Sequence, residues 1–119
     1  MTSVNFYKIP EKDNFRDIKE AQELTDLVKA QKLVVLDIYA NWCQPCRYIG
    51  PKFKELSKSH PEAVFAKINI ESLNPEQVKE FGVTALPTFL YFKSGRYVDK
   101  VMGANILDVV DKLMLYKLL

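Results

Sequence analysis

The chain has 119 residues, of which 48% are hydrophobic and 27% charged, values typical of one globular domain with one hydrophobic core. Its 17 basic and 15 acidic residues leave a formal net charge of +2, too small for a phosphate-binding surface, so we expect no nucleic-acid partner. No apolar run approaches the ~20 residues of a membrane helix, and residues 1–8 lack the basic and apolar regions of a signal peptide, so we expect a cytosolic protein without membrane contact.

Residues 1–13 carry only a weak extended pattern that ends in a polar run. We interpret them as an N-terminal extension and assign one domain to residues 14–119. In this interpretation residues 15–18 form a short first strand. The alternative places a strand at 4–9 and begins a helix at the start of the domain.

The remaining elements alternate between helices and strands. Apolar periodicity and turn residues predict helices over 20–31, 43–59, 74–82 and 105–119, and strands over 33–39, 63–70, 88–93 and 96–102. Residues 33–39 are apolar on both alternating faces, which suits a central strand covered on both sides. Helical connections make the early strands parallel, while the hairpin at Ser94-Gly95 adds antiparallel ones. We therefore predict an α/β fold with a mixed central β-sheet flanked on both faces by helices.

Local signals mark two of the helices. Asn74, Pro75 and Gln77 have the order of a capping box with proline at the first helical position, and Gly82 is a natural end for this short helix. Pro51 lies inside the preceding helix, where it removes a backbone hydrogen bond, so we expect a kink there.

Both cysteines of the chain lie in the segment Trp42-Cys43-Gln44-Pro45-Cys46, directly after the predicted central strand. Two thiols at this spacing, where a strand leads into a helix, indicate redox chemistry. Backbone N–H groups and the helix dipole favour a thiolate at the helix start, which makes Cys43 the expected nucleophile. Cys46, one turn further on, faces the same side and is expected to close a disulfide with Cys43.

The alternatives for this cysteine pair are a zinc site and an inert structural disulfide. Zinc normally takes four protein ligands, and beyond the two cysteines the sequence offers only His60, so we expect no metal. A structural disulfide between positions this close in sequence constrains little chain entropy, so we rank it below redox use. We interpret His60 as a solvent-exposed residue at a helix end.

Asp37 is a carboxylate inside the apolar run of residues 33–39. Burial disfavours the charged form of such a group and is expected to raise its pKa. The alternative is an exposed aspartate on an edge strand.

Together these residues resemble the thioredoxin family, and the resemblance extends from about residue 14 onward. It rests on the combination of Trp42-Cys43-x-Pro45-Cys46 with Asp37, Pro51, Leu86-Pro87-Thr88, Gly95 and Gly103-Ala104. The resemblance implies the thioredoxin fold and a protein-disulfide reductase that exchanges a dithiol for a disulfide. It also implies a thioredoxin reductase, dependent on NADPH or ferredoxin, as the electron donor.

The resemblance further implies roles for individual residues. Cys43 attacks a substrate disulfide, and Cys46 then cleaves the mixed disulfide. Asp37 accepts the Cys46 proton through water, Lys67 pairs with Asp37, and Pro87 is in cis beside the disulfide. The implied substrate surface consists of Trp42, which precedes a cysteine that we expect to be exposed, together with Ala85, Leu86, Met102, Gly103 and Ala104. The alternatives are a core position for Trp42 and plain hairpin packing for Met102.

Two positions depart from the family pattern. Gln44 replaces the usual glycine of the motif, and Tyr39 stands where tryptophan is common. Pro45 is the residue associated with reducing members of the family. Glutamine favours helix over glycine in both redox forms, so Gln44 is expected to shift the reduction potential by at most on the order of tens of millivolts.

We therefore expect a monomeric thiol–disulfide oxidoreductase that reduces disulfide-containing protein substrates. It needs no bound cofactor, because the Cys43–Cys46 pair is itself the redox-active group. Two other functions stay open. The chain is alternatively a binding or adaptor subunit that keeps the fold, or a disulfide isomerase-like oxidoreductase of an oxidising compartment.

Overall fold

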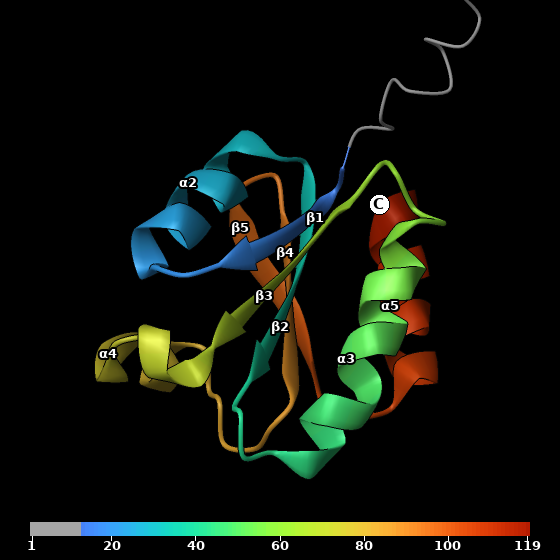
Figure 1. The fold of residues 1–119 in the computed structure, drawn as a ribbon. Helices are drawn as coiled ribbons and strands as arrows, with labels where there is room; N and C mark the ends of the chain where they lie inside the picture. Colours follow the sequence, from blue (N-terminus) through green and yellow to red (C-terminus); the bar gives the residue numbers. More distant parts are fainter. Residues whose placement is uncertain (1–12) are drawn as a thin grey trace, which may run out of the picture.

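A five-stranded β-sheet lies between two layers of helices in the computed structural model, which describes residues 13–119 (Figure 1). The strands are β1 (Phe15–Ile18), β2 (Leu33–Tyr39), β3 (Val64–Asn69), β4 (Thr88–Lys93) and β5 (Arg96–Met102). The helices are α2 (Ala21–Ala30), α3 (Gln44–Ser57), α4 (Pro75–Glu80) and α5 (Ile106–Leu118), with a short 3-10 turn at Ile70–Ser72. The predicted N-terminal extension lies, up to residue 12, outside the described residues, as does the alternative strand at 4–9.

The strand order is β1-β3-β2-β4-β5, so β2 is the central strand, as predicted. β1, β3 and β2 are mutually parallel, and β4 and β5 are added in antiparallel pairings, which confirms the mixed sheet. The alternative helix at the start of the domain is wrong, because β1 pairs with β3 from Phe15 onward. None of the helices within residues 13–119 is long and apolar enough to cross a membrane.

The double-sided apolar pattern of β2 divides the core into two clusters. Val34, Leu36 and Ile38 belong to the cluster beneath α2 and α4, whereas Leu33 and Val35 belong to the cluster beneath α3 and α5. Figure 1 shows α2 and α4 on one face of the sheet and α3 and α5 on the other. The single core expected from the sequence is thus split by the sheet, with the odd-numbered side chains of β2 directed towards α3.

Turn chemistry fixes the predicted element ends. Asn74 and Gln77 form the predicted capping box, and α4 ends just before Gly82, whose φ is +65°. The hairpin between β4 and β5 turns at Ser94 and Gly95, both with positive φ, as a tight hairpin connection requires. α3 continues through Pro51 as one helix. The loops after β2, after α4 and after β5 therefore lie at the same end of the sheet, where β2 and β5 finish and β4 begins.

Candidate active site

The two cysteines form a disulfide at the point where β2 leads into α3. Cys43 is the N-cap of α3, and its Sγ accepts a hydrogen bond from the backbone N–H of Cys46 at 3.3 Å. This position next to free helix N–H groups is where a thiolate is stabilised. The predicted pairing is confirmed. The expected exposure of Cys43 is wrong, because both cysteines are only 5% exposed.

A groove of about 450 Å³ gives access to this disulfide from one side. Its lining comes from the motif and from two distant segments: Trp42, Cys43, Gln44, Pro45, Ile70, Val83, Thr84, Ala85 and Leu86. Trp42 is 71% exposed, so the core alternative for this side chain is wrong. The structure therefore brings Trp42, Ala85 and Leu86 together beside Cys43, as the family resemblance implied.

The opposite wall of the groove is held by the loop before β4. The Leu86–Pro87 peptide bond is cis, as expected from the resemblance. The Pro87 carbonyl accepts a hydrogen bond from the Gly103 N–H at 2.8 Å, and the Thr88 hydroxyl donates to the Ala85 carbonyl at 2.6 Å. Leu86 packs against the cysteines. These contacts place Ala85 and Leu86 across the groove from the motif.

The end of β5 and the loop after it contribute less to the groove than expected, since none of the three predicted residues there, Met102, Gly103 and Ala104, lines it. Met102 is half exposed and borders the groove through its sulfur, which accepts a hydrogen bond from the Thr84 hydroxyl at 3.5 Å. Gly103 supports the cis-proline loop. Ala104 packs against the core cluster beneath α3 and α5, so the structure does not place it with the groove residues.

Asp37 lies in the middle of β2 and faces α3, with Lys67 of β3 and Phe89 of β4 in register on either side. It is only 2% exposed, and its Oδ1 has no hydrogen-bond partner among the residues that the structure describes. Burial raises the pKa of Asp37 from 3.8 to about 7, and the positive charge of Lys67 offsets part of that rise. The prediction of a buried carboxyl is confirmed, and the edge-strand alternative is wrong.

Lys67 does not form the predicted ion pair, because no salt bridge joins it to Asp37 within residues 13–119. Its ammonium group instead lies 5.4 Å from the centre of the Tyr39 ring. Lys67 and Asp37 are register partners on adjacent strands, so the lysine charge still acts on Asp37 through space.

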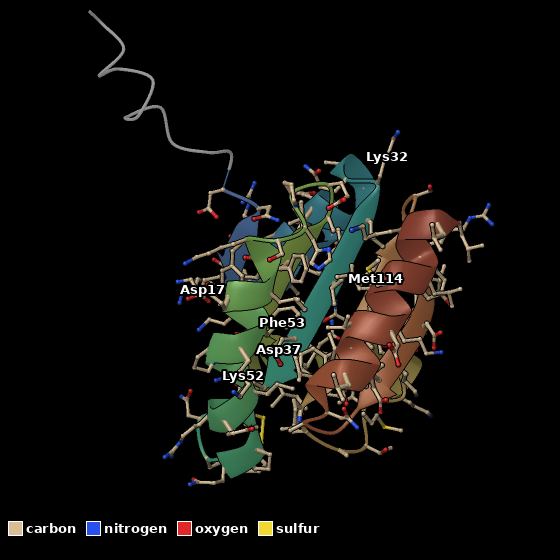
Figure 2. The ribbon with its side chains drawn as sticks, turned by 90° about the vertical axis from the view of Figure 1, so that its right-hand side faces the viewer. Asp17, Lys32, Asp37, Lys52, Phe53 and Met114 are labelled. Carbon is tan, nitrogen blue, oxygen red and sulfur yellow. A yellow bond between two sulfur atoms is a disulfide. The ribbon has the colours of Figure 1, made fainter. Side chains whose placement is uncertain are left out.

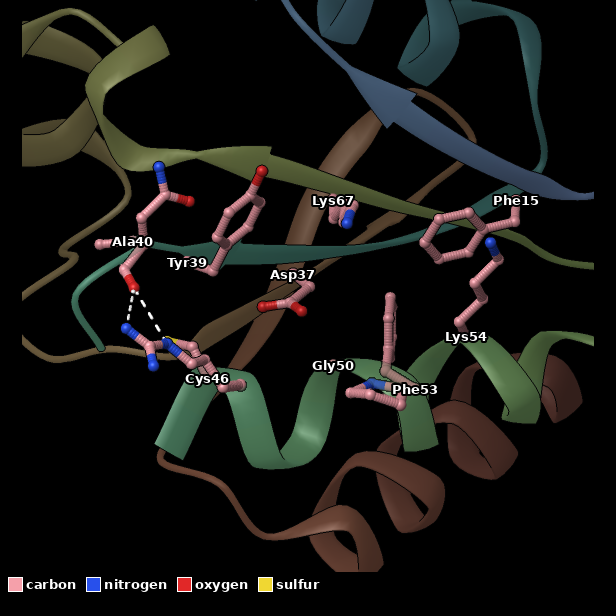
Figure 3. A pocket seen from close by; sticks show the side chains of 12 residues that line it. Phe15, Asp37, Tyr39, Ala40, Cys46, Gly50, Phe53, Lys54 and Lys67 are labelled. Carbon is pink, nitrogen blue, oxygen red and sulfur yellow. Dashed lines mark hydrogen bonds between the residues drawn. The ribbon is translucent and has the colours of Figure 1, made fainter. Parts of the chain in front are cut away.

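A second hollow, the Asp37 cavity, lies between the sheet and α3 and has a volume of about 390 Å³. Figure 3 shows Asp37 directed from β2 towards α3, with Cys46 at one end of the hollow. Its lining consists of Phe15, Asp37, Tyr39, Ala40, Asn41, Cys46, Arg47, Gly50, Pro51, Phe53, Lys54 and Lys67. The disulfide therefore separates two spaces, with Cys43 in the groove and Cys46 in the cavity.

Several of these residues were missed by sequence reasoning. Val83 and Thr84 directly precede the predicted Ala85, so their place in the same loop is the sequence signal for them. Ile70 reaches the groove only because β3 lies beside β2. Arg47 follows the motif and donates two hydrogen bonds, at 3.2 and 3.0 Å, to the Asn41 carbonyl. It thereby ties α3 to the loop that carries Trp42.

His60 lies away from this site and is not the exposed helix-end residue that we expected. It is half-buried, its ring stacks on Phe65 at 6.3 Å, and its Nδ1 lies 2.9 Å from Lys117 Nζ. Within residues 13–119 no three His, Cys, Asp or Glu side chains lie close enough together to hold a metal ion.

A family model described as Thioredoxin matches residues 15–115. A thioredoxin H-type of Picea mariana is 43% identical over 91 residues, which are 76% of this chain and 72% of that protein. Thioredoxin H5 of Arabidopsis thaliana is 40% identical over 93 residues, 78% of each chain. Thioredoxin-2 of Pyricularia oryzae is 38% identical over 104 residues, but the match spans only 60% of that longer protein.

Solved structures of thioredoxins have a similar fold. Fasciola hepatica thioredoxin superposes with a TM-score of 0.77 at 37% identity, covering 85% of this chain and 98% of that one. A chain from a complex of ferredoxin:thioredoxin reductase with thioredoxin f2 has a TM-score of 0.80 at 33% identity, covering 88% and 96%.

Proposed function

The chain belongs to the thioredoxin family and is a thiol–disulfide oxidoreductase of the protein-disulfide reductase type, and from that premise we propose a role for each residue of the site. One observation carries the proposal. The Cys43–Cys46 disulfide has an open groove on its Cys43 side and a cavity with a buried carboxyl on its Cys46 side. This arrangement supports attack from the groove and proton removal from the cavity.

In the reduced protein, Cys43 is the nucleophile. Its place as the N-cap of α3 and the Cys46 N–H directed at its sulfur favour the thiolate form. The Cys43 thiolate attacks one sulfur of a substrate disulfide. A bond forms between Cys43 and that sulfur, the substrate S–S bond breaks, and the other substrate sulfur leaves as a thiolate.

Cys46 completes the transfer. It loses its proton, through water in the Asp37 cavity, to the Asp37 carboxylate, whose pKa of about 7 suits a base at neutral pH. The Cys46 thiolate attacks Cys43, the mixed disulfide breaks, and the substrate departs as its second thiolate. Two electrons have passed from the dithiol to the substrate, and Cys43 and Cys46 are left bonded.

The groove suits an extended substrate segment. Its walls, Trp42 on one side and Ala85 and Leu86 on the other, are mainly apolar and tolerate many side chains. Pro87 has no N–H, so it does not compete for hydrogen bonds near the sulfurs. Gln44 and Pro45 also line this groove, so we propose that Gln44 contacts substrate as well as tuning the potential.

The reduced form must be restored by an external donor. The solved complex of ferredoxin:thioredoxin reductase with a similar chain supports a reductase of the thioredoxin reductase type as this partner. The disulfide is the redox group of our proposal, and no bound cofactor takes part. A cytosolic location, a monomeric state and a domain over residues 14–119 stay predictions from the sequence.

The test is reduction of insulin with NADPH and a thioredoxin reductase. We expect the wild-type protein to turn over many insulin disulfides per molecule, and we expect Cys43→Ser to reduce the rate to that of the reductase alone, because no nucleophile remains. Absence of turnover in the wild type would contradict the proposal and favour an adaptor.

The isomerase alternative is separated by the reduction potential, measured at equilibrium in a glutathione buffer. We expect a value well below the roughly −180 mV of protein disulfide isomerase. A potential near that value would favour an isomerase.

A further inference from the structure

The Asp37 cavity is larger than a proton path to Cys46 requires. Its volume of about 390 Å³ is within the range of roughly 300–1,000 Å³ that is typical of small-molecule sites. It shares no lining residue with the substrate groove. A molecule in this cavity would therefore not occupy the substrate's place.

The rim of the cavity carries positive charge on aromatic surfaces. Lys54 Nζ lies 5.3 Å from the centre of the Phe15 ring, and Lys67 Nζ lies 5.4 Å from that of Tyr39. All four residues line the cavity, and Figure 3 shows Lys54 with Phe15 and Lys67 with Tyr39 around Asp37. Neither lysine has a carboxylate within salt-bridge distance in the part of the chain that the structure describes. These ammonium groups are suited to an anionic ligand group.

The inner end of the cavity is apolar apart from one group. Phe53 is fully buried and packs edge-on against Phe15, with 6.3 Å between ring centres. Figure 2 shows Phe53 and Asp37 side by side between the sheet and the helices. The Asp37 carboxyl group is that group, and its Oδ1 has no hydrogen-bond partner among the residues that the structure describes. A hydroxyl group on a ligand would donate a hydrogen bond to this carboxyl group in place of water.

We propose that the Asp37 cavity binds a small aromatic carboxylic acid that carries a hydroxyl group at its far end. The carboxylate lies near Lys54, the ring lies against Phe15 and Phe53, and the hydroxyl at the far end donates to the Asp37 carboxyl group. One consequence rests on the proposed function: an occupant displaces water between Asp37 and Cys46 and thereby slows the resolving step.

The test uses 6-hydroxy-2-naphthoate as the probe and follows backbone amide NMR shifts of the oxidised protein. We expect saturable shifts at cavity residues, including Gly50 and Phe53, and none confined to Trp42 and Leu86. The matched controls are 2-naphthoate, which lacks the donor, and 6-hydroxy-2-naphthamide, which lacks the charge. Each is expected to bind about fivefold more weakly, the equivalent of one modest hydrogen bond or ion pair.

Variants locate the site. Lys54→Gln is expected to weaken binding of the hydroxynaphthoate about fivefold and to leave binding of the amide unchanged. Lys58→Gln is the matched control, because Lys58 follows Lys54 by four residues, is exposed and already contacts Glu55 at 3.2 Å, so we expect no effect. Gly50→Leu is expected to abolish binding, since a Cβ at Gly50 meets open space within the lining and a larger side chain fills it.

Equal affinity for all three probes, shifts centred on the groove, or no saturable shift at millimolar probe would each overturn the proposal. Binding that leaves the resolving step at its normal rate would keep the site and contradict the role of Asp37 instead. Failure of insulin reduction in the wild type, by contrast, would contradict the proposed function and say nothing against this site.

Discussion

Below its pKa of about 7, Asp37 is a neutral acid inside the core, and above it Asp37 is a buried anion. Asp37 is buried because the odd-numbered residues of β2 face α3, and all of these residues except Tyr39 are buried. Above that pKa the protein therefore carries a destabilising buried charge in the cavity that Cys46 also lines. In our proposal this charge is retained for proton transfer, and its cost appears in the free energy of unfolding.

Asp37→Asn tests that cost. The pKa of Asp37 is raised on folding, so the folded state holds its proton longer than the unfolded state does. The stability of the wild type therefore falls as pH rises from about 4 to about 7, and the loss is complete above that pH. We expect the variant to gain stability over the wild type across this window, by roughly 4 kcal/mol at most, given 1.36 kcal/mol per pKa unit.

The measurement is urea unfolding of both proteins at several pH values between 4 and 8. The comparison of the two proteins at each pH removes the contributions of the other carboxylates. A stability difference that stays constant over this range would contradict the burial of Asp37 as an anion.

One glycine lies inside α3 and another follows α4, and they have opposite effects on stability. Gly82 follows α4 with a φ of +65°, and the Lys100 ammonium donates to its carbonyl at 3.0 Å. Lys100 thereby binds the end of α4 to β5, just ahead of the loop that forms the groove wall. Gly50 lies inside α3, where glycine costs conformational entropy.

Alanine at each position is expected to change the free energy of unfolding with opposite sign. Gly82→Ala places a Cβ in a left-handed conformation and 2.5 Å from Lys100 Nζ, so we expect a loss of about 1–2 kcal/mol. Gly50→Ala meets no atom within 4 Å and is expected to gain up to about 1 kcal/mol. Urea titrations of both variants decide this, and a shift of the same sign in both would contradict the account.

Helices and turns that carry local signals were predictable from the sequence, but the residue at which a helix ends was not always predicted correctly. The capping box at Asn74 and the turn at Gly95 fix their ends through neighbouring residues, so both were predicted. The helix predicted over 43–59 ends two residues early, at Ser57. The contact of Lys100 with α4 joins residues 18 apart, and no local pattern reports it.

In the molecule as a whole, α5 is held to the connection between α3 and β3 by a small polar cluster. Lys117 Nζ lies 2.9 Å from His60 Nδ1 and 3.1 Å from Glu62 Oε2. A lysine ammonium only donates hydrogen bonds, so His60 Nδ1 must be the acceptor and the ring must be neutral. Protonation of His60 would set two cations against each other.

His60→Gln tests this cluster. Burial, followed by the charge of Lys117, lowers the pKa of His60 on folding, with Glu62 acting in the opposite direction. The contribution of His60 to stability is therefore present above its unfolded value of 6.5 and is lost as pH falls through its folded pKa. The variant has no ionisable group there, so its stability is expected to fall less than that of the wild type below pH 6.5.

Amide hydrogen exchange in the last turn of α5 provides the measurement, with the wild type compared at pH 7 and at pH 5. We expect faster opening at pH 5 in the wild type and a smaller change in His60→Gln. Parallel behaviour of the two proteins would contradict the role of His60.

The candidate site was predictable where its residues carry their own signal. The cysteine pair and Asp37 stand out within one strand and the turn after it. Pro87 needed the family resemblance, because nothing nearby marks a cis bond. Ile70 reaches the groove because β3 lies beside β2, Arg47 contacts the Asn41 carbonyl across the turn, and the Asp37 cavity forms only where α3 packs on the sheet. The predicted Lys67–Asp37 ion pair was wrong because the Lys67 ammonium lies over the Tyr39 ring instead.

The central claim is that Cys43 attacks and Cys46 resolves, and Cys46→Ser tests it most directly. The reduced variant is mixed with a peptide that contains one disulfide, and the products are analysed by mass spectrometry. We predict a stable mixed disulfide on Cys43, since serine cannot displace the substrate, whereas the wild type releases reduced peptide. Cys43→Ser is the matched control and is expected to form little adduct. A faster adduct on Cys46 in Cys43→Ser than on Cys43 in Cys46→Ser would contradict the account.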